Sequence, residues 1–262
     1  MPCLRRVLDA PLPRGWRLSV VVVDDASGAS SARTVSDARA LLESSCSANA
    51  RGAPPASGDL ARPLLVACDV IQHARNRGKG AALRTGFDWV LQHGDGTDLA
   101  VIQDADLEYD PRDFASLIAA AERCDAARGC VAVYGNRWSS GAGPSRSLWH
   151  RIHRLGNATL TGASNLATGY ALADMECCYK LMPVAVLRRV RPMLNEDRFG
   201  VEPQLTAALA RIGARIDEVP VRYDARAYRQ GKKIGVRDAV RTMWVIAREW
   251  LRAPGPRSPH GH

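Results

Sequence analysis

The sequence predicts an α/β fold with a mostly parallel sheet flanked by helices. Apolar, β-branched stretches alternate with helical patterns through the first half of the 262-residue chain, which is typical of strands joined by right-handed helical crossovers. The run Leu18–Val23 is almost entirely valine, as in a strand buried on both faces of a parallel sheet. Polar clusters follow three of the predicted strands, and ligands of such sheets bind outside the carboxyl ends of the strands.

Apolar periodicity and turn residues give the expected order of elements. β-branched runs predict strands, and apolar residues at helical spacing predict helices between them. The expected strands are residues 18–23, 64–70, 99–103, 131–134 and 215–223. The expected helices are residues 3–9, 32–43, the segment from Leu83 to Leu91, and residues 111–123, 147–166, 183–190, 201–212 and 236–251.

We expect a single domain over residues 1–252. Between residues 44 and 62 the composition shifts to Ser, Ala, Gly and Pro, which is typical of a flexible surface insertion. Residues 253–262 are rich in Pro, Gly and Arg and predict a disordered tail.

Composition narrows the classes of function. The net charge is +9, and the segment from Arg222 to Arg252 carries nine basic against three acidic side chains. Such a charge suits an anionic partner, for example phosphates or an acidic membrane face. The sequence contains no apolar run near the ~18 residues of a membrane-spanning helix and no signal peptide before Pro11. Seven scattered cysteines indicate reduced thiols in a cytoplasmic protein.

Three carboxylates, Asp104, Asp106 and Glu108, follow the predicted strand 99–103. On extended backbone, side chains two residues apart point the same way, so the three could converge on one point. Crowded carboxylates repel one another unless a cation lies among them, and Mg²⁺ or Mn²⁺ takes such oxygens and bridges them to phosphates. The alternative interpretation is a solvated acidic turn.

Two more polar clusters lie at predicted strand ends. Asp24 and Asp25 could accept hydrogen bonds from a base or a ribose, or could cap a turn. The segment Asn76–Gly80 places two glycines beside Lys79 at the start of a helix, where backbone can approach a phosphate closely. Its glycine spacing matches neither a P-loop nor a dinucleotide fingerprint.

Five segments occur in one order along the chain: Val23-Asp-Asp-Ala-Ser27, Asn76-Arg-Gly-Lys-Gly-Ala-Ala-Leu-Arg-Thr-Gly-Phe87, Gln103-Asp-Ala-Asp-Leu-Glu-Tyr-Asp-Pro111, Asp174-Met-Glu-Cys-Cys-Tyr-Lys180 and Arg226-Ala-Tyr-Arg-Gln-Gly-Lys-Lys-Ile234. Together they resemble the family 2 glycosyltransferases, specifically the dolichyl-phosphate or polyprenyl-phosphate mannosyl- and glucosyltransferases. The resemblance covers most of residues 3–245. It implies the Rossmann-like GT-A fold, but without the family's first strand and the Pro-x-Tyr-Asn-Glu-like nucleotide loop that follows it.

The resemblance implies a donor site with a divalent metal. Asp24 and Asp25 would lie at the nucleoside of a sugar nucleotide, GDP-mannose or UDP-glucose. Asp104 and Asp106 would form the DxD pair that holds Mg²⁺ or Mn²⁺ against the donor diphosphate, with Glu108 as a third ligand.

The resemblance also implies groups near the reacting atoms. Lys79 would lie near the donor. Asp174 would be the catalytic residue that faces the reacting sugar and the acceptor, either positioning the nucleophile or acting as a weak base. The alternative for Asp174 is a capping or ion-paired acid beside Lys180, and the alternative for the basic residues is a solvated loop. The basic residues implied at the donor diphosphate and the acceptor phosphate are Arg226, Lys232 and Lys233.

The last predicted helix, residues 236–251, leaves two interpretations open. An apolar stripe usually docks a terminal helix on the core. Alternatively, the Trp and Arg residues of this helix touch an anionic membrane surface. The stripe consists of Val236, Val240, Met243, Ala247 and Leu251.

The function implied by the resemblance is a metal-dependent, inverting glycosyltransferase. It would transfer a hexose, with mannose favoured, from a nucleotide sugar to a polyprenyl phosphate at the cytoplasmic face of the membrane, with peripheral membrane contact. Two other classes stay open. A truncated GT-A remnant could be non-catalytic and act as a binding or interaction protein. The +9 charge also fits a nucleic-acid-binding protein, although no binding motif with interleaved aromatic residues supports nucleic acid as a partner.

Overall fold

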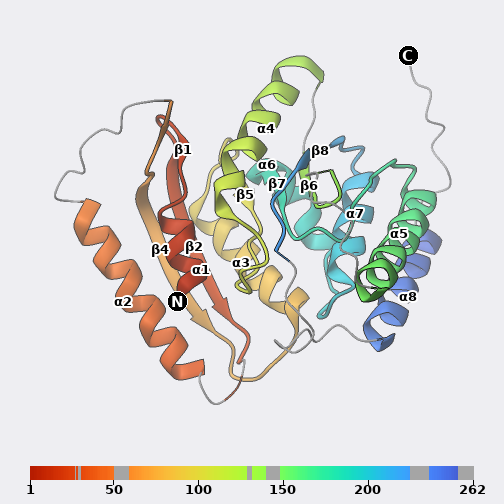
Figure 1. Ribbon diagram of the computed structural model, residues 1–262, viewed down its shortest axis with the longest axis horizontal. Helices are drawn as coiled ribbons and strands as arrows, with labels where there is room; N and C mark the ends of the chain where they lie inside the picture. Colours follow the sequence, from red (N-terminus) through yellow and green to blue (C-terminus); the bar gives the residue numbers. More distant parts are fainter. Residues whose placement is uncertain are drawn as a thin grey trace.

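The computed structural model describes residues 1–26, 28, 31–49, 59–128, 132–139, 148–224 and 236–252. Strands occupy the middle of the molecule, and helices lie on both sides of them (Figure 1). The strands are β1 (Leu12–Pro13), β2 (Arg17–Asp24), β3 (Leu60–Ala61), β4 (Leu64–Gln72), β5 (Leu99–Val101), β6 (Ala132–Asn136), β7 (Lys180–Pro183) and β8 (Ile216–Pro220). The helices are α1 (Pro2–Leu8), α2 (Ser31–Asn49), α3 (Lys79–His93), α4 (Phe114–Arg128), α5 (Leu148–Thr168), α6 (Val184–Val190), α7 (Val201–Arg211) and α8 (Val236–Arg252), with 3-10 helices η1 (Pro111–Asp113) and η2 (Arg191–Met193).

The described strands form three separate sheets. β2 pairs with β4 in parallel, and the short β1 pairs with β3 in antiparallel orientation. β5, β7, β6 and β8 form a four-stranded sheet in that order. β6 and β8 are parallel, whereas β7 runs antiparallel to β5 and β6. The α/β class is confirmed, with β7 as an antiparallel strand inside the larger sheet.

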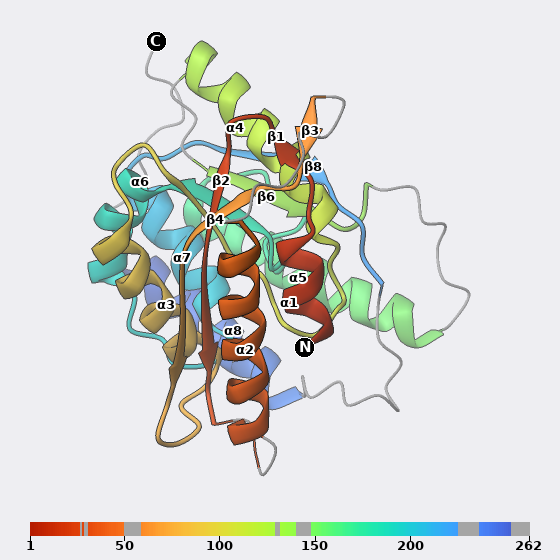
Figure 2. The same cartoon turned by 90° about the vertical axis from the view of Figure 1, so that its left-hand side faces the viewer.

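Helices cover the sheets at both ends of the molecule. α2 lies outside the β2–β4 pair, and Figure 2 shows it in front of these strands. A small apolar core beneath α2 includes Leu8, Leu42 and Leu65. At the opposite end α5 and α8 pack against each other and against α7. No helix in the described ranges is long and apolar enough to cross a membrane.

The β2–β4 pair and the four-stranded sheet are not joined by a strand among the described residues. The prediction that residues 18–23 are buried on both faces is wrong, because the four valines of β2 are only half-buried and Ser19 is exposed. Among the described strands β2 pairs with β4 alone, so no described strand covers its other edge as a second neighbour covers a central strand.

The predicted insertion is shorter than residues 44–62. α2 continues to Asn49, and residues 60 and 61 belong to β3. The serines at 44, 45 and 47 return their hydroxyl hydrogen bonds to carbonyl oxygens three or four residues back in the helix, so these polar residues remain compatible with a helix. Residues 50–58 lie outside the described part of the chain, as does the predicted tail 253–262. The single domain over residues 1–252 stays a prediction.

Most other elements match the sequence to within a few residues, with one omission. The pattern does not predict β7, because Lys180-Leu-Met-Pro183 is short and shows no alternation of apolar and polar residues. Pairing with β5 and β6 makes it a strand, and α6 follows from Val184. β5 ends at Val101 rather than at residue 103, and the predicted helix 111–123 begins as η1 before continuing as α4.

A loop before α7 fixes the start of α3. The Ala81 amide donates to the Asp197 carbonyl oxygen at 3.1 Å, and Arg84 donates to the Glu196 carbonyl oxygen and to the Asp197 carboxylate. Gln204 of α7 holds the loop, since its Oε1 accepts the Glu196 amide at 2.8 Å. The loop approaches α3 so closely that a Cβ at Gly80 would overlap the Glu196 carbonyl oxygen.

The close approach of the loop to Gly80 predicts how adding one methyl group at this position affects stability. Replacing Gly80 by Ala should lower the free energy of unfolding by about 1–3 kcal/mol, because backbone must move to admit the methyl. Gly86→Ala, in the same helix, is the matched control: its Cβ would meet Val23 and Val21 at 3.7 and 3.8 Å, an ordinary contact. That control should be neutral or up to about 1 kcal/mol more stable. Urea unfolding of both variants measures the difference, and equal stabilities would contradict the proposed packing.

Candidate active site

The Asp25 carboxylate organises the loop that follows β4. It accepts hydrogen bonds from the backbone amides of Arg77 (2.9 Å) and Gly78 (2.6 Å), and the Asn76 side chain donates to the Asp25 carbonyl oxygen at 3.0 Å. Gly78 has a φ of +105°, which favours glycine. Asp25 therefore holds residues 76–78 at the N-terminus of α3. It stabilises a turn, as the alternative to a nucleoside contact predicted.

His73 ties Asp25 to α3 and was missed by the sequence reasoning. Its Nδ1 lies 2.7 Å from Asp25 Oδ1, and its Nε2 lies 2.9 Å from the Thr85 hydroxyl. The available signal was its position directly after β4, at the same sheet edge. The neighbouring carboxylate of Asp24 is buried at the end of β2 and accepts from the Gln72 side chain at 3.4 Å.

Lys79 lies between two carboxylates from distant parts of the chain. Its Nζ is 2.9 Å from Asp104 Oδ2 and 2.9 Å from Glu202 Oε1, and Glu202 also pairs with the buried Lys180 at 2.6 Å. Burial alone would lower the pKa of Lys79, but the Asp104 and Glu202 carboxylates outweigh it and raise that pKa well above its usual value. Lys79 is therefore a permanent cation beside the acidic turn.

The acidic turn is not extended. β5 ends at Val101, and Leu107 has a φ of +68°, so alternate side chains from 104 to 108 do not share one direction. Asp106 Oδ1 accepts the Glu108 amide at 3.1 Å, and Tyr223 donates to Glu108 Oε2 at 3.1 Å. Among the described residues no three His, Cys, Asp or Glu side chains gather closely enough to hold a metal. The expected convergence of three carboxylates is thus absent, because it assumed extended backbone.

Asp104 and Asp106 nevertheless fit a divalent ion of the kind that a nucleotide brings. Mg²⁺ is commonly held by one or two carboxylates, with phosphates and water completing its shell. Burial raises the pKa of Asp104, but the charge and hydrogen bond of Lys79, with smaller contributions from Cys178 and Lys180, together outweigh burial and lower that pKa. The carboxylate is therefore ionised at neutral pH and available to a cation.

Asp174 is buried and fully engaged in an ion pair with Arg137. The Arg137 Nε and Nη2 atoms lie 2.7 and 2.6 Å from its two carboxylate oxygens, and the Arg137 amide donates to it at 3.0 Å. Glu218 fixes the backbone on the other side by accepting the Asp174 amide at 2.9 Å. The ion-paired alternative predicted from the sequence is thus what the structure shows, with Arg137 as the partner instead of Lys180.

Arg137 was not predicted, although it follows β6 at the polar edge of the larger sheet. Its guanidinium lies 5.2 Å from the ring centres of both Trp138 and Tyr223, a range in which aromatic faces attract cations. Tyr223 in turn holds Glu108. The acidic turn and the Asp174 pair are therefore connected through one tyrosine.

Glu176 is a second group that the sequence reasoning missed, although it lies two residues after Asp174 in the same segment. Burial, followed by the charge of Glu202, raises the pKa of Glu176 to about 7. One of its carboxylate oxygens is enclosed and has no hydrogen-bond partner within the described ranges. The charges of Lys180, Arg137 and Lys79 all lower the pKa of Glu176, but they do not offset burial and the charge of Glu202.

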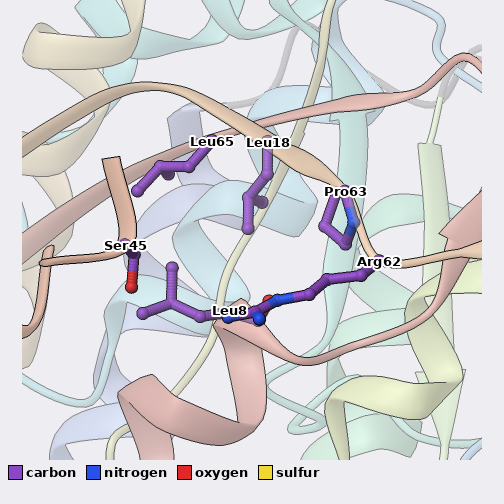
Figure 3. Close-up of a pocket in the computed structure, with 6 residues that line it drawn as sticks. All are labelled: Leu8, Leu18, Ser45, Arg62, Pro63 and Leu65. Carbon is purple, nitrogen blue, oxygen red and sulfur yellow. The ribbon is translucent and has the colours of Figure 1, made fainter. Parts of the chain in front are cut away.

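Two hollows in the described structure differ in their relation to this site. The pocket in Figure 3 has a volume of about 10 Å³, room for at most one water, and it contains none of the predicted site residues. Its lining residues are Leu8, Leu18, Ser45, Arg62, Pro63 and Leu65. The other, of about 430 Å³, lies on the Glu108 side of the acidic turn and reaches Asp224. The predicted phosphate-binding residues Arg226, Lys232 and Lys233 follow directly but lie outside the described residues.

Comparison with solved structures identifies the fold. A structure of glucosyl-3-phosphoglycerate synthase from Mycobacterium tuberculosis, in complex with Mn²⁺, UDP-glucose and phosphoglyceric acid, has a TM-score of 0.52 at 15% identity and covers 95% of this chain and 83% of that one. Another structure of that enzyme has a TM-score of 0.53 at 17% identity, with coverage of 95% and 84%. These neighbours are GT-A glycosyltransferases, and at this identity the likeness concerns the fold.

Sequence comparison gives relatives and a family. An undecaprenyl-phosphate mannosyltransferase of Micrococcus luteus is 27% identical over 191 residues, 70% of this chain and 74% of that protein. A polyprenol monophosphomannose synthase of Mycolicibacterium smegmatis is 26% identical over 206 residues, 76% of this chain and 73% of that protein. The family described as "Glycosyl transferase family 2" matches residues 56–191. Since the match spans just over half of its length, the chain belongs to glycosyl transferase family 2 and is a glycosyltransferase with the GT-A fold.

Proposed function

We propose that this glycosyltransferase moves a hexose, with mannose favoured, from a nucleotide sugar to a polyprenyl phosphate with inversion at the sugar carbon. The observation that carries the proposal is the ion pair of Lys79 with Asp104 at a polar sheet edge, beside the loop that Asp25 holds. Support for the acceptor comes from the two relatives, whose names specify mannose and a polyprenyl phosphate or polyprenol. The donor is GDP-mannose or UDP-glucose.

The donor site would lie along the sheet edge from β2 to the acidic turn. Asp24 would contact the nucleoside, and Asp25 would act there mainly by shaping residues 76–78. Asp104 and Asp106 would hold Mg²⁺ or Mn²⁺, which supplies positive charge to the diphosphate that leaves during transfer. Lys79 adds a fixed cation at the same place. Glu108 would serve as an anchor to Tyr223 rather than as a third metal ligand.

The acceptor requires orientation more than deprotonation. A polyprenyl phosphate is already anionic at neutral pH, so its oxygen can attack the sugar carbon without a strong base. Asp174 would act through Arg137: by holding the guanidinium in a fixed plane it would position the acceptor phosphate. Arg226, Lys232 and Lys233 would neutralise the donor diphosphate and the acceptor phosphate. The reaction would take place at the cytoplasmic face of the membrane, on a single domain of residues 1–252.

A non-catalytic GT-A protein is the second candidate, and the break between β2 and β5 favours it. Among the described residues, no strand joins the β2–β4 pair to the larger sheet at the edge where the nucleotide would bind. Calorimetry with GDP, UDP and Mn²⁺ separates the two candidates, because a non-catalytic remnant should show no metal-dependent nucleotide binding.

The transfer assay tests the proposed reaction directly. Labelled sugar from GDP-mannose or UDP-glucose should reach a short polyprenyl phosphate in the presence of Mn²⁺, and EDTA should abolish the transfer. Asp106→Ala should lower the rate about a hundredfold, since charge stabilisation at the leaving group is lost. Glu108→Gln is the matched control on the same turn and should retain Mn²⁺ affinity. Transfer that persists in EDTA, or at an unchanged rate in Asp106→Ala, would contradict the mechanism.

Two substitutions separate positioning from base catalysis at Asp174. If Asp174 acts through Arg137, Asp174→Asn and Arg137→Lys should each lower kcat by about tenfold to a hundredfold. The shape of the pH–rate profile and the Kd for the nucleotide should stay the same in both variants. If Asp174 is a general base instead, Asp174→Asn alone should remove the acidic limb of the profile. Circular dichroism of both variants checks that the loss of a buried pair has not unfolded the protein.

The raised pKa of Glu176 predicts a pH dependence of donor binding. The carboxyl is neutral below its pKa of about 7 in the folded protein, against an ordinary value of 4.5, so it gains a negative charge as pH rises from 6 to 8. That charge opposes a bound diphosphate by on the order of 1 kcal/mol, about a fivefold change in Kd. The Kd for the nucleotide sugar, whose doubly esterified diphosphate does not titrate in this range as the terminal phosphate of free GDP does, should therefore rise in the wild type and stay level in Glu176→Gln. Equal pH dependence in both proteins would exclude Glu176 as the titrating group.

A further inference from the structure

α8 presents a continuous apolar stripe to solvent. Its members recur at intervals of three and four residues and so lie on one side of the helix. The exposure of its large side chains ranges from 37% for Met243 to 81% for Leu251. The outer stripe of α8 consists of Val240, Met243, Trp244, Ala247, Trp250 and Leu251.

This arrangement corrects the prediction that the stripe docks on the core. Four of the five residues expected to face inward are exposed, and the fifth, Val236, has no described side chain. The residues that pack inward are Thr242, Val245, Ile246 and Glu249. The buried apolar side chains of Val245 and Ile246, together with a buried polar network, therefore hold α8 to the protein, whereas the apolar stripe does not.

The network fixes α8 firmly. Arg241 donates to Glu196 at 2.6 Å, and Glu249 lies 2.6 Å from Arg211 and 2.8 Å from Arg248. Gln204 donates to the same Glu249 carboxylate at 3.1 Å. Because charge-assisted bonds anchor its inner side, α8 keeps the outer stripe in a constant orientation.

The charge around the outer stripe is positive. Both glutamates of the network are buried, whereas the side chains of Arg241 and Arg252 are about half-exposed. In the pairs of Arg241 with Glu196 and of Arg252 with Glu249, the arginine therefore faces solvent and the carboxylate does not. Four arginines share the two carboxylates in this part of the described chain: Arg211, Arg241, Arg248 and Arg252 surround Glu196 and Glu249.

The neighbouring helix adds uncharged surface at the same end of the molecule. α5 packs against α8, and both lie on the far side from α2 (Figure 1). No charged residue occurs between residues 155 and 173. Leu155 and Leu166 of α5 are exposed. The described surface formed by α5 and α8 is thus largely apolar, and at the rim of α8 the half-exposed Arg241 and Arg252 outnumber Asp238, which is partly exposed.

We infer that the outer stripe of α8 is the surface by which the enzyme rests on an anionic lipid bilayer. A helix with Trp and Leu on one side and arginine beside them lies in the membrane interface, where indole rings are favoured and arginine meets lipid phosphates. The inference rests on the proposed function, since a polyprenyl phosphate acceptor is reached only at a membrane surface.

Vesicle binding tests the surface. Wild-type protein should sediment with vesicles of phosphatidylcholine and phosphatidylglycerol, weakly with phosphatidylcholine alone, and less at high salt. Trp244→Ser/Leu251→Ser should weaken binding to the mixed vesicles by about tenfold or more. Leu64→Ser/Val66→Ser is the matched control, because these exposed β4 side chains lie at the α2 end of the molecule. It should bind as the wild type does.

Two outcomes would overturn the inference. One is unchanged vesicle binding in Trp244→Ser/Leu251→Ser. The other is a wild type that ignores vesicles and forms a dimer, by light scattering, which the same substitutions convert to a monomer. Transfer to a short, water-soluble prenyl phosphate tests the proposed function separately from the docking surface, because this acceptor needs no membrane. The wild type, Trp244→Ser/Leu251→Ser and Leu64→Ser/Val66→Ser should catalyse this transfer equally. A wild type that binds vesicles but transfers nothing would refute the proposed function and leave the docking surface standing.

Discussion

The ammonium group of Lys79 joins three parts of the chain that are distant in sequence. Lys79 begins α3, and its partners are Asp104 in the turn after β5 and Glu202 in α7. Glu202 extends the contact to Lys180 in β7. A buried charge without a partner costs several kcal/mol, so each of these groups requires the others. The start of α3, the acidic turn and α7 are consequently positioned as one unit, and the candidate donor site is built on that unit.

The sequence predicts the order of elements well where hydrophobic periodicity is strong. The valines of β2 and the apolar faces of α3 and α7 identify these elements without reference to the rest of the chain. β7 escapes prediction because its four residues become a strand only through pairing with β5 and β6. The degree of burial of a strand is not predicted from the sequence either. The composition of β2 indicates a central strand, but the exposure of β2 depends on whether a neighbouring strand is present on each side.

For the site, the sequence identifies which segments meet at the sheet edge but not how their side chains pair. Asp25 was expected at the nucleoside and holds a loop, and Asp174 is occupied by Arg137. Glu108 turns toward Tyr223 because Leu107 adopts a positive φ. The residue types in the turn do not predict this backbone conformation. Arg137 and His73 belong to none of the five segments, and only their positions after strands could have drawn attention to them. Glu176 lies inside the segment from Asp174 to Lys180, but the sequence does not distinguish it from its neighbours.

Glu196 connects the two surfaces that the proposed reaction requires. Its carbonyl oxygen accepts from Arg84 in α3, two turns or less from Lys79, while its carboxylate accepts from Arg241 in α8. A nucleotide sugar arrives from water and a polyprenyl phosphate lies in a bilayer, so the donor site must keep a constant height above the lipid. A helix that rests on lipid, tied by one residue to the start of α3, satisfies this requirement without a membrane-spanning segment in the described chain. The polar network under α8 thus lies where the proposed transfer requires a fixed distance between the donor site and the lipid surface.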